Sequence, residues 1–284
     1  SMKLNTTSMP PVDFYEGDSS GIRLGIFVEN SCQLLLFIET DQGSCTYNST
    51  LRSEVREYLI DWRNRSKDEA LRGRGYGMID GQICDYPDPY RHFALNGYGY
   101  LGLIRVAEML TAVEPVYSTK LVKEALDWKQ DIRESLHESM ARSPVVPLGD
   151  GSWCPTAPPW AEGCGPVAIF SDDIDWYSKE RWNYYNRTGA QFWVRDSLLS
   201  PQYLMFQEII GLDEPSAKHL HAFNTDMLLL RNVVSSQPYY SRHPWVHLRQ
   251  GEVKSFLKAY YNCMSAQSDR ETYSFPEGIV RSVT

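Results

Sequence analysis

Apolar residues alternate with polar ones near the start of the chain. Ile22, Leu24, Ile26 and Val28 occupy every second position, and the apolar run Leu34–Ile38 follows after a short polar break. Alternation of this kind places the apolar side chains on one face of a strand. The pattern predicts a short N-terminal β-hairpin within an otherwise irregular segment.

The apolar spacing changes to a helical repeat after residue 50. Val55, Tyr58 and Trp62 recur at intervals of three or four residues, among charged neighbours. Apolar residues at such intervals share one face of an α-helix. We therefore expect an N-terminal segment of residues 1–50 and a mainly α-helical domain of residues 51–284.

A first pair of helices is predicted over Tyr90–Val113 and Thr119–Arg142. Glu114 and Pro115 separate the two helices, and Ser118 is suited to cap the second one. Helices joined by so short a connection lie antiparallel. The second helix should bury one apolar stripe, which consists of Leu121, Ala125, Trp128, Ile132, Leu136 and Met140.

A second pair of helices has clear boundary residues. Pro201 is a favourable first helical residue after Ser200, and Gly211 should end that helix. Pro215 then begins the next helix, down which Phe223, Met227 and Leu230 would run. The sequence predicts a second helical hairpin here.

A final helix is expected from Gly251 or Glu252 to about Gln267. Its buried face should consist of Val253, Phe256, Leu257, Tyr260 and Met264. Two aromatic-rich stretches, residues 143–190 and 237–247, lie between the helices. Long loops of this kind usually carry function.

The net charge and the apolar runs of the chain limit the kinds of partner that it can bind. The chain has 28 basic and 36 acidic residues, a net charge of -8, which disfavours binding to nucleic acid. The sequence contains no run of 18 apolar residues, so we expect a soluble chain without a membrane partner.

The sequence leaves the cellular location open between several alternatives. Four N-x-[ST] triplets start at Asn5, Asn48, Asn64 and Asn186, and they are glycosylation acceptors only in a secreted eukaryotic protein. Two pairs of cysteines, Cys32 with Cys45 and Cys154 with Cys164, bracket short loops and suit either disulfides or free thiols. These features favour a secreted or periplasmic location, although coincidence explains the triplets equally well.

Two stretches, Gln191–Leu204 and Gln237–Asn262, resemble the catalytic domains of the six-hairpin glycosidase superfamily. The likeness covers roughly residues 90–275. It implies helical hairpins as in a complete or partial (α/α)6 toroid. It also implies a carbohydrate substrate, a cleft with aromatic walls, and a pair of carboxylates for acid and base catalysis.

Four carboxylates are candidates for this catalytic pair, because glycoside hydrolysis needs one protonated and one ionised carboxyl group. Asp150 precedes Gly151 and also suits an ordinary turn. Asp175 also suits a solvated loop, and Asp196 at a predicted helix start also suits a helix-terminal charge. Glu271 follows the last predicted helix, where an exposed carboxylate is equally expected.

The candidate substrate-binding residues are aromatic rings that stack on sugars and side chains that donate to hydroxyls. Packing of the loops on the helices is the alternative for each of them. The set consists of Trp153, Trp160, Trp176, Trp193, Arg195, Tyr240, Arg242, His243, Trp245 and His247.

We expect neither a metal nor another cofactor. His243 and His247 would share a face only if their stretch were helical, and Pro244 is the expected place for a helix to begin. Two other functions fit the same scaffold. One is a polysaccharide lyase, with Tyr240 or His243 as the base and Arg242 neutralising a uronate. The other is a non-catalytic carbohydrate-binding or structural protein.

Overall fold

The computed structural model describes residues 59–81, 90–166, 202–226 and 242–267, and these residues are mainly helical. The predicted N-terminal β-hairpin lies outside the described residues. Among the helices that the structure describes, none combines the length and the apolar character needed to cross a bilayer.

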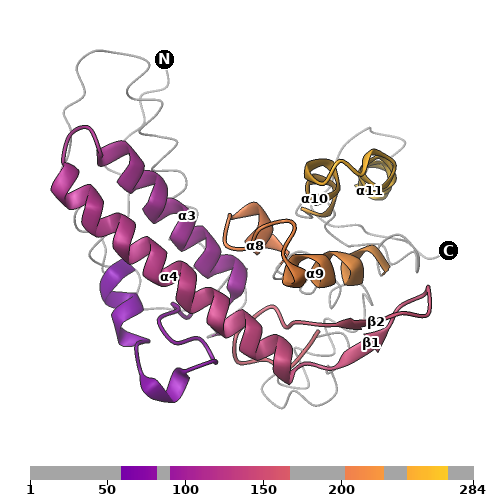
Figure 1. Cartoon of the computed structure of the whole chain (residues 1–284), viewed down its shortest axis with the longest axis horizontal. Coiled ribbons are helices and arrows are strands. Elements are labelled where there is room, and N and C mark those ends of the chain that lie inside the picture. Colours follow the sequence, from indigo (N-terminus) through magenta and orange to yellow (C-terminus); the bar gives the residue numbers. More distant parts are fainter. Residues whose placement is uncertain (1–58, 82–89, 167–201, 227–241, 268–284) are drawn as a thin grey trace.

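The largest unit is a hairpin of two long helices, α3 (Phe93–Leu110) and α4 (Pro115–Arg142), which run side by side (Figure 1). The prediction of an antiparallel pair is confirmed. The predicted stripe on α4 is buried, except for Met140, which is partly exposed and packs on the same core. Gly99 allows the close approach, because a Cβ there would lie 2.2 Å from the Trp128 ring.

The start of α4 differs from the prediction. The helix begins at Pro115 and its N-cap is Glu114, because proline is favourable in a first turn, where its missing N–H costs nothing. Ser118 therefore lies inside the helix. Its hydroxyl donates to the carbonyl oxygen of Ala107 in α3 at 2.7 Å, so it joins the two helices rather than capping one.

Residues 59–81 pack along α4, from Glu124 to Arg142. They contain a helical stretch over 59–65 and the 3₁₀-helix η3 (Glu69–Leu71). Arg63 is buried and ion-paired with both Glu124 and Asp131 of α4. A buried guanidinium requires such partners, so the pairing fixes this segment on α4.

The stretch 143–166, expected as loop, contains a small antiparallel sheet. Strands β1 (Val145–Pro147) and β2 (Trp153–Pro155) pair with Val146 opposite Cys154. Three residues per strand are too few for a reliable alternating pattern, which is why the sequence did not reveal them. Cys154 and Cys164 are free thiols, so the suggested bridge between them is absent.

The second predicted hairpin is only partly present. Helix α8 (Tyr203–Phe206) is a single turn that ends well before Gly211, because Glu208 has a φ of 62°. Helix α9 (Pro215–Thr225) begins at Pro215 as predicted. Ser200, Pro201, Met227 and Leu230 lie outside the described residues.

Two further helices, α10 (His243–Arg249) and α11 (Val253–Gln267), lie next to each other beside α9 (Figure 1). The extent of α11 agrees with the prediction, but its buried face does not. Val253, Leu257 and Tyr260 are exposed, Phe256 and Met264 are half-buried, and Ala259 is buried. Helix α10 occupies a stretch that was expected as loop.

Candidate metal centre

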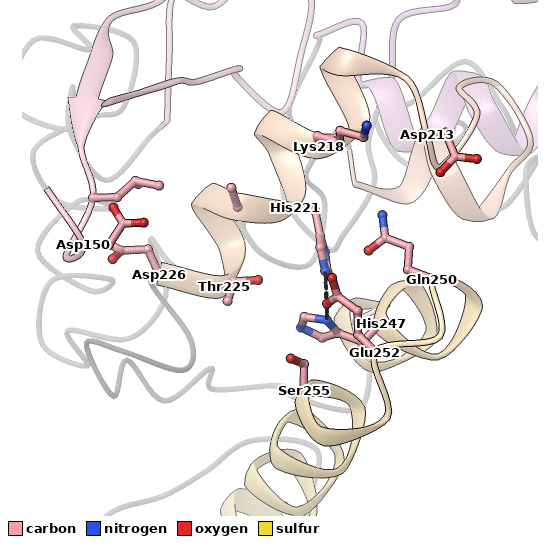
Figure 2. A pocket seen from close by; sticks show the side chains of 12 residues that line it. Asp150, Asp213, Lys218, His221, Thr225, Asp226, His247, Gln250, Glu252 and Ser255 are labelled. Carbon is pink, nitrogen blue, oxygen red and sulfur yellow. Dashed lines mark hydrogen bonds and ion pairs between the residues drawn. The ribbon is translucent and has the colours of Figure 1, made fainter. Parts of the chain in front are cut away.

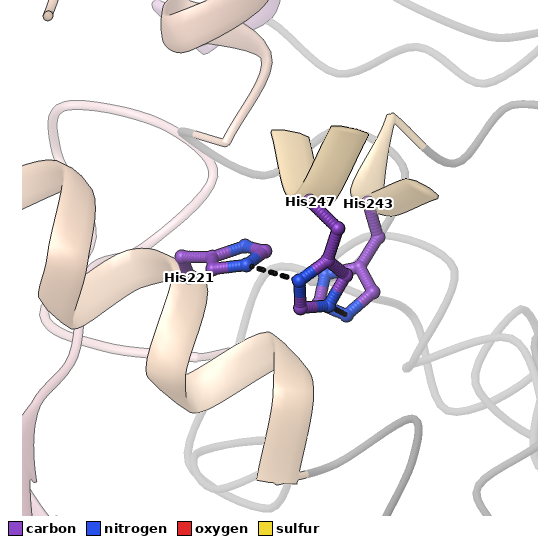
Figure 3. Close-up of side chains that lie close together, drawn as sticks. All are labelled: His221, His243 and His247. Atoms are coloured by element: carbon purple, nitrogen blue, oxygen red, sulfur yellow. Dashed lines mark hydrogen bonds between the residues drawn. The ribbon is translucent and has the colours of Figure 1, made fainter. Parts of the chain in front are cut away.

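Three histidine side chains meet between α9 and α10. His221 comes from α9, and His243 and His247 come from α10 (Figure 3). One ring nitrogen of each residue lies within 4.8 Å of those of the other two, and all three residues are buried. The chain has six histidines, so half of them gather at this point.

The local sequence explains why two of the imidazoles share a helix face. Arg242 is the N-cap of α10 and Pro244 lies in its first turn, so the helix already includes His243. Residues four apart in an α-helix project from the same face. The stretch is helical from His243 onward, so the condition under which His243 and His247 share a face is met, and their spacing no longer argues against a metal.

Each imidazole is held through its Nδ1 atom. The Nε2 atom of Gln202 lies 2.9 Å from Nδ1 of His243 and 3.4 Å from Nδ1 of His221. A carboxylate oxygen of Glu252 lies 2.6 Å from Nδ1 of His247. Histidines that ligate a metal usually hold their second nitrogen in this way, so the arrangement presents the Nε2 atoms as ligands.

Burial keeps all three imidazoles neutral. It lowers the pKa of His221 to about 3, with a smaller effect from nearby His247. It lowers the pKa of His243 well below the usual value, assisted by the two neighbouring histidines. It also lowers the pKa of His247, which Glu252 partly opposes. Neutral imidazole is the form that binds a metal ion.

The hydrogen bonds among neutral rings cannot all be satisfied. Nε2 of His243 lies 3.0 Å from Nε2 of His247, and Nε2 of His221 lies 3.0 Å from Nδ1 of His247. A neutral imidazole has one N–H and one lone pair. If the Gln202 amide donates to both Nδ1 atoms, an N–H of His221 faces the N–H that His247 gives to Glu252.

If the Gln202 amide is turned by 180°, the two facing N–H groups disappear, but two facing lone pairs arise elsewhere in the cluster. The amide oxygen then accepts an N–H from both Nδ1 atoms, and the Nε2 lone pairs of His243 and His247 face each other. In that arrangement all three Nε2 atoms carry lone pairs. A cation between the rings removes the remaining repulsion.

A cavity of about 530 Å³ opens beside the cluster (Figure 2). His221, His247 and Glu252 line one end of it, and Asp150 and Asp226 lie together at the other. The backbone N–H of Gly149 donates to Asp226 at 2.6 Å, which joins the β1–β2 turn to the end of α9. His243 is not among the residues that line it.

Only one of the four predicted catalytic carboxylates lies among the described residues. Asp150 is exposed and accepts hydrogen bonds from the backbone N–H and hydroxyl of Ser152, which lower its pKa. The turn interpretation therefore holds, although the residue also borders the cavity. Asp175, Asp196 and Glu271 lie outside the described residues.

Among the described residues, the lining of this cavity holds no Trp, Tyr or Phe, so the predicted aromatic walls are not seen there. Trp160 is buried and stacks on Tyr90, with ring centroids 5.1 Å apart. Trp153 is 67% exposed on β2, and Trp245 packs edge-to-face on Phe206. The hydrophobic packing interpretation therefore applies to Trp160 and Trp245.

The remaining predicted binding residues divide into three groups. Arg242 caps α10 and lies over the rings of Tyr203 and Phe206, at 5.4 and 4.8 Å from their centroids. His243 and His247 belong to the cluster. The residues outside the described part of the chain are Trp176, Trp193, Arg195 and Tyr240.

Sequence reasoning missed His221, Gln202 and Glu252. The four-residue spacing of His243 and His247 was the available signal. It would have predicted a shared helix face if the start of α10 had been predicted at His243. No local pattern joins His221 to them, because it comes from another helix.

No protein-family model matches this chain, and no curated protein or solved structure does. The candidate centre is therefore argued from its own geometry.

Proposed function

We propose that this protein binds one divalent transition-metal ion, Zn²⁺ in the first place, through His221, His243 and His247. The observation that carries the proposal is that three buried imidazoles converge while a second group holds each Nδ1 atom. Three neutral imidazole nitrogens suit Zn²⁺ and its neighbours in the transition series far better than Mg²⁺ or Ca²⁺.

Titration of the full chain with Zn²⁺ in a calorimeter, with a competing chelator, tests this function. We expect one ion per chain and a higher melting temperature, because a ligand of the folded state stabilises it. Loss of one ligand, as in His221→Ala or His247→Ala, should weaken binding by roughly 100-fold or more, beyond the effect of losing a supporting residue.

His219→Ala is the matched control. His219 lies on α9 two residues before His221, but it does not belong to the cluster. Its substitution should leave the affinity unchanged. Absence of binding in the unaltered chain, or an equal loss in His219→Ala, would overturn the proposal.

The second candidate function is the glycoside hydrolase of the six-hairpin type. It is favoured by the meeting of Asp150 and Asp226 at one end of the cavity. A carbohydrate partner and the (α/α)6 arrangement, with α3 and α4 as one hairpin, belong to this candidate. The low pKa of Asp150 suits a base, so a separate acid would be needed.

Release of reducing sugar from a panel of polysaccharides tests this candidate. Activity should be lost in Asp150→Asn and in Asp226→Asn. Retention of activity in both variants would remove this pair as the catalytic one. A polysaccharide lyase is less favoured at this cavity, because its acidic wall opposes a uronate. Sugar binding without turnover would favour the non-catalytic alternative.

A further inference from the structure

We infer that the metal centre is open on its cavity side, where an exchangeable water completes the coordination and Glu252 accepts a hydrogen bond from it. This inference rests on the metal binding proposed above. It assigns the centre to the catalytic class of metal sites and not to the structural class.

The number of protein ligands is the first argument. Structural zinc sites are closed by four protein ligands, whereas catalytic sites have three and a water. The clustered imidazoles number three. Among the described residues, no further histidine, cysteine or carboxylate group joins all three of them at ligand distance.

The position of the cavity is the second argument. Two of the three ligand residues, His221 and His247, line the cavity, whereas His243 does not. A space of about 530 Å³ thus adjoins these two imidazoles. A small molecule can reach the ion from this side.

The placement of Glu252 is the third argument. Its carboxylate oxygen lies 2.6 Å from Nδ1 of His247 and 3.9 Å from Nε2 of His221. The contact with Nδ1 is the one expected of a carboxylate that supports a ligating histidine from outside the coordination sphere. The Glu252 side chain is half-exposed to the cavity, so its other oxygen can reach a water on the ion.

The backbone holds Glu252 in this place. Gln250 is the C-cap of α10, and Gly251 follows with a φ of 74°, a left-handed conformation that favours glycine. The N–H of Glu252 then donates to the carbonyl oxygen of His247 at 2.9 Å. The turn between α10 and α11 therefore fixes the carboxylate beside the histidine that it supports.

The charge of the cavity indicates the substrate class. Among the described residues, its lining carries four carboxylates, those of Asp150, Asp213, Asp226 and Glu252, and one ammonium, that of Lys218. Such a wall attracts cationic groups and repels anionic ones. An open centre in this cavity would therefore act on neutral or cationic substrates rather than on phosphates or uronates.

The test replaces Zn²⁺ with Co²⁺, whose visible absorption reports its coordination, and adds sodium azide. We expect a saturable change of the spectrum with one azide per Co²⁺. In Glu252→Gln, Co²⁺ should still bind within about 100-fold of the unaltered affinity. Azide should bind several-fold more tightly to this variant, because a neighbouring negative charge has been removed.

Glu108→Gln removes one charge from α3, outside the cavity lining, and should change neither affinity. A Co²⁺ spectrum that azide leaves unaltered would overturn the open centre while metal binding stands. Azide binding only in Glu252→Gln would show that Glu252 is a fourth ligand, which also overturns it. Absence of any Co²⁺ spectrum would instead overturn the proposed function.

Discussion

The α3–α4 hairpin and the histidine cluster both bury polar side chains, but they satisfy them differently. In the hairpin, Asn96 accepts hydrogen bonds from the backbone N–H of Ile79 at 2.7 Å and from the indole N–H of Trp128 at 3.0 Å. Its amide nitrogen donates to the carbonyl oxygens of Ile79 and His92. Each donor has an acceptor, so this network needs nothing more.

The cluster between α9 and α10 is arranged differently. Three neutral rings face one another, and their contacts with one another and with Gln202 cannot all be hydrogen bonds. Groups buried for stability satisfy one another, whereas groups buried for a ligand leave room for it. The difference separates a structural polar network from a binding site, and four predictions test it.

The largest effect, a loss of Zn²⁺ affinity, is expected for His243→Ala. It removes one of the three candidate ligands, so Zn²⁺ affinity should fall by roughly 1,000-fold, beyond the loss expected for a supporting residue. The ring is buried and contacts Gln202, so a moderate loss of metal-free stability should accompany the change. Calorimetric titration and thermal unfolding without metal measure the two quantities. A large loss of metal-free stability with unchanged Zn²⁺ affinity would mean that the histidine cluster is a structural network and not a binding site.

The next largest effect, a loss of stability, is expected for Asn96→Ala. Several buried N–H and carbonyl groups would lose their partner, so the free energy of unfolding should fall by at least about 3 kcal/mol. Zn²⁺ affinity of the folded variant should be unchanged. Denaturant unfolding measures the first quantity, and Gln130→Ala on the exposed side of α4 is the control. A loss below about 1 kcal/mol would contradict the assigned network.

A smaller effect is expected from pH on the metal-free protein. Burial lowers the pKa values of His221, His243 and His247, so the unfolded chain binds more protons below its usual histidine pKa of about 6.5. The free energy of unfolding is therefore unaffected by these histidines above about pH 6.5 to 7. It decreases as the pH falls from about 7 towards 3.

Thermal unfolding between pH 8 and pH 5 measures this dependence. Replacement of all three histidines by alanine should flatten the decline between pH 7 and pH 5. An equally steep decline in the triple variant would assign the effect to other groups.

The smallest effect is expected for Asp150→Asn. The side chain is exposed, and its bonds to Ser152 stay within one turn, so the melting temperature should stay within the error of the measurement. Zn²⁺ affinity should not change either. A clear fall of the melting temperature would mean that Asp150 belongs to the buried framework.

The helices were predictable where the deciding pattern was local. The stripe from Leu121 to Leu136 identified α4 and its partner, because one helix face carries the whole signal. Pro115 was taken as the end of one helix, whereas it begins the next, since proline serves both roles. The exposed face of α11 depended on which neighbours cover it, and its own sequence does not contain that information.

The candidate site was less predictable, because it depends on contact between separate elements. His243 and His247 were selected as binding residues, and their four-residue spacing was recognised. His221 joins them only once α9 packs against α10, and Glu252 only through the turn after α10. Neither condition is visible in a single stretch of sequence.

Helix α10 has only seven residues, and this length has a consequence for its dynamics. Two turns do not form a stable helix by themselves in water, because nucleation costs more than so few hydrogen bonds return. An ion held by both ends of α10 and by α9 would act as a cross-link on this short segment. Amide hydrogen exchange in residues 243–249 should then slow on metal addition while α3 and α4 stay unchanged, so the ion would control local unfolding of the segment that binds it.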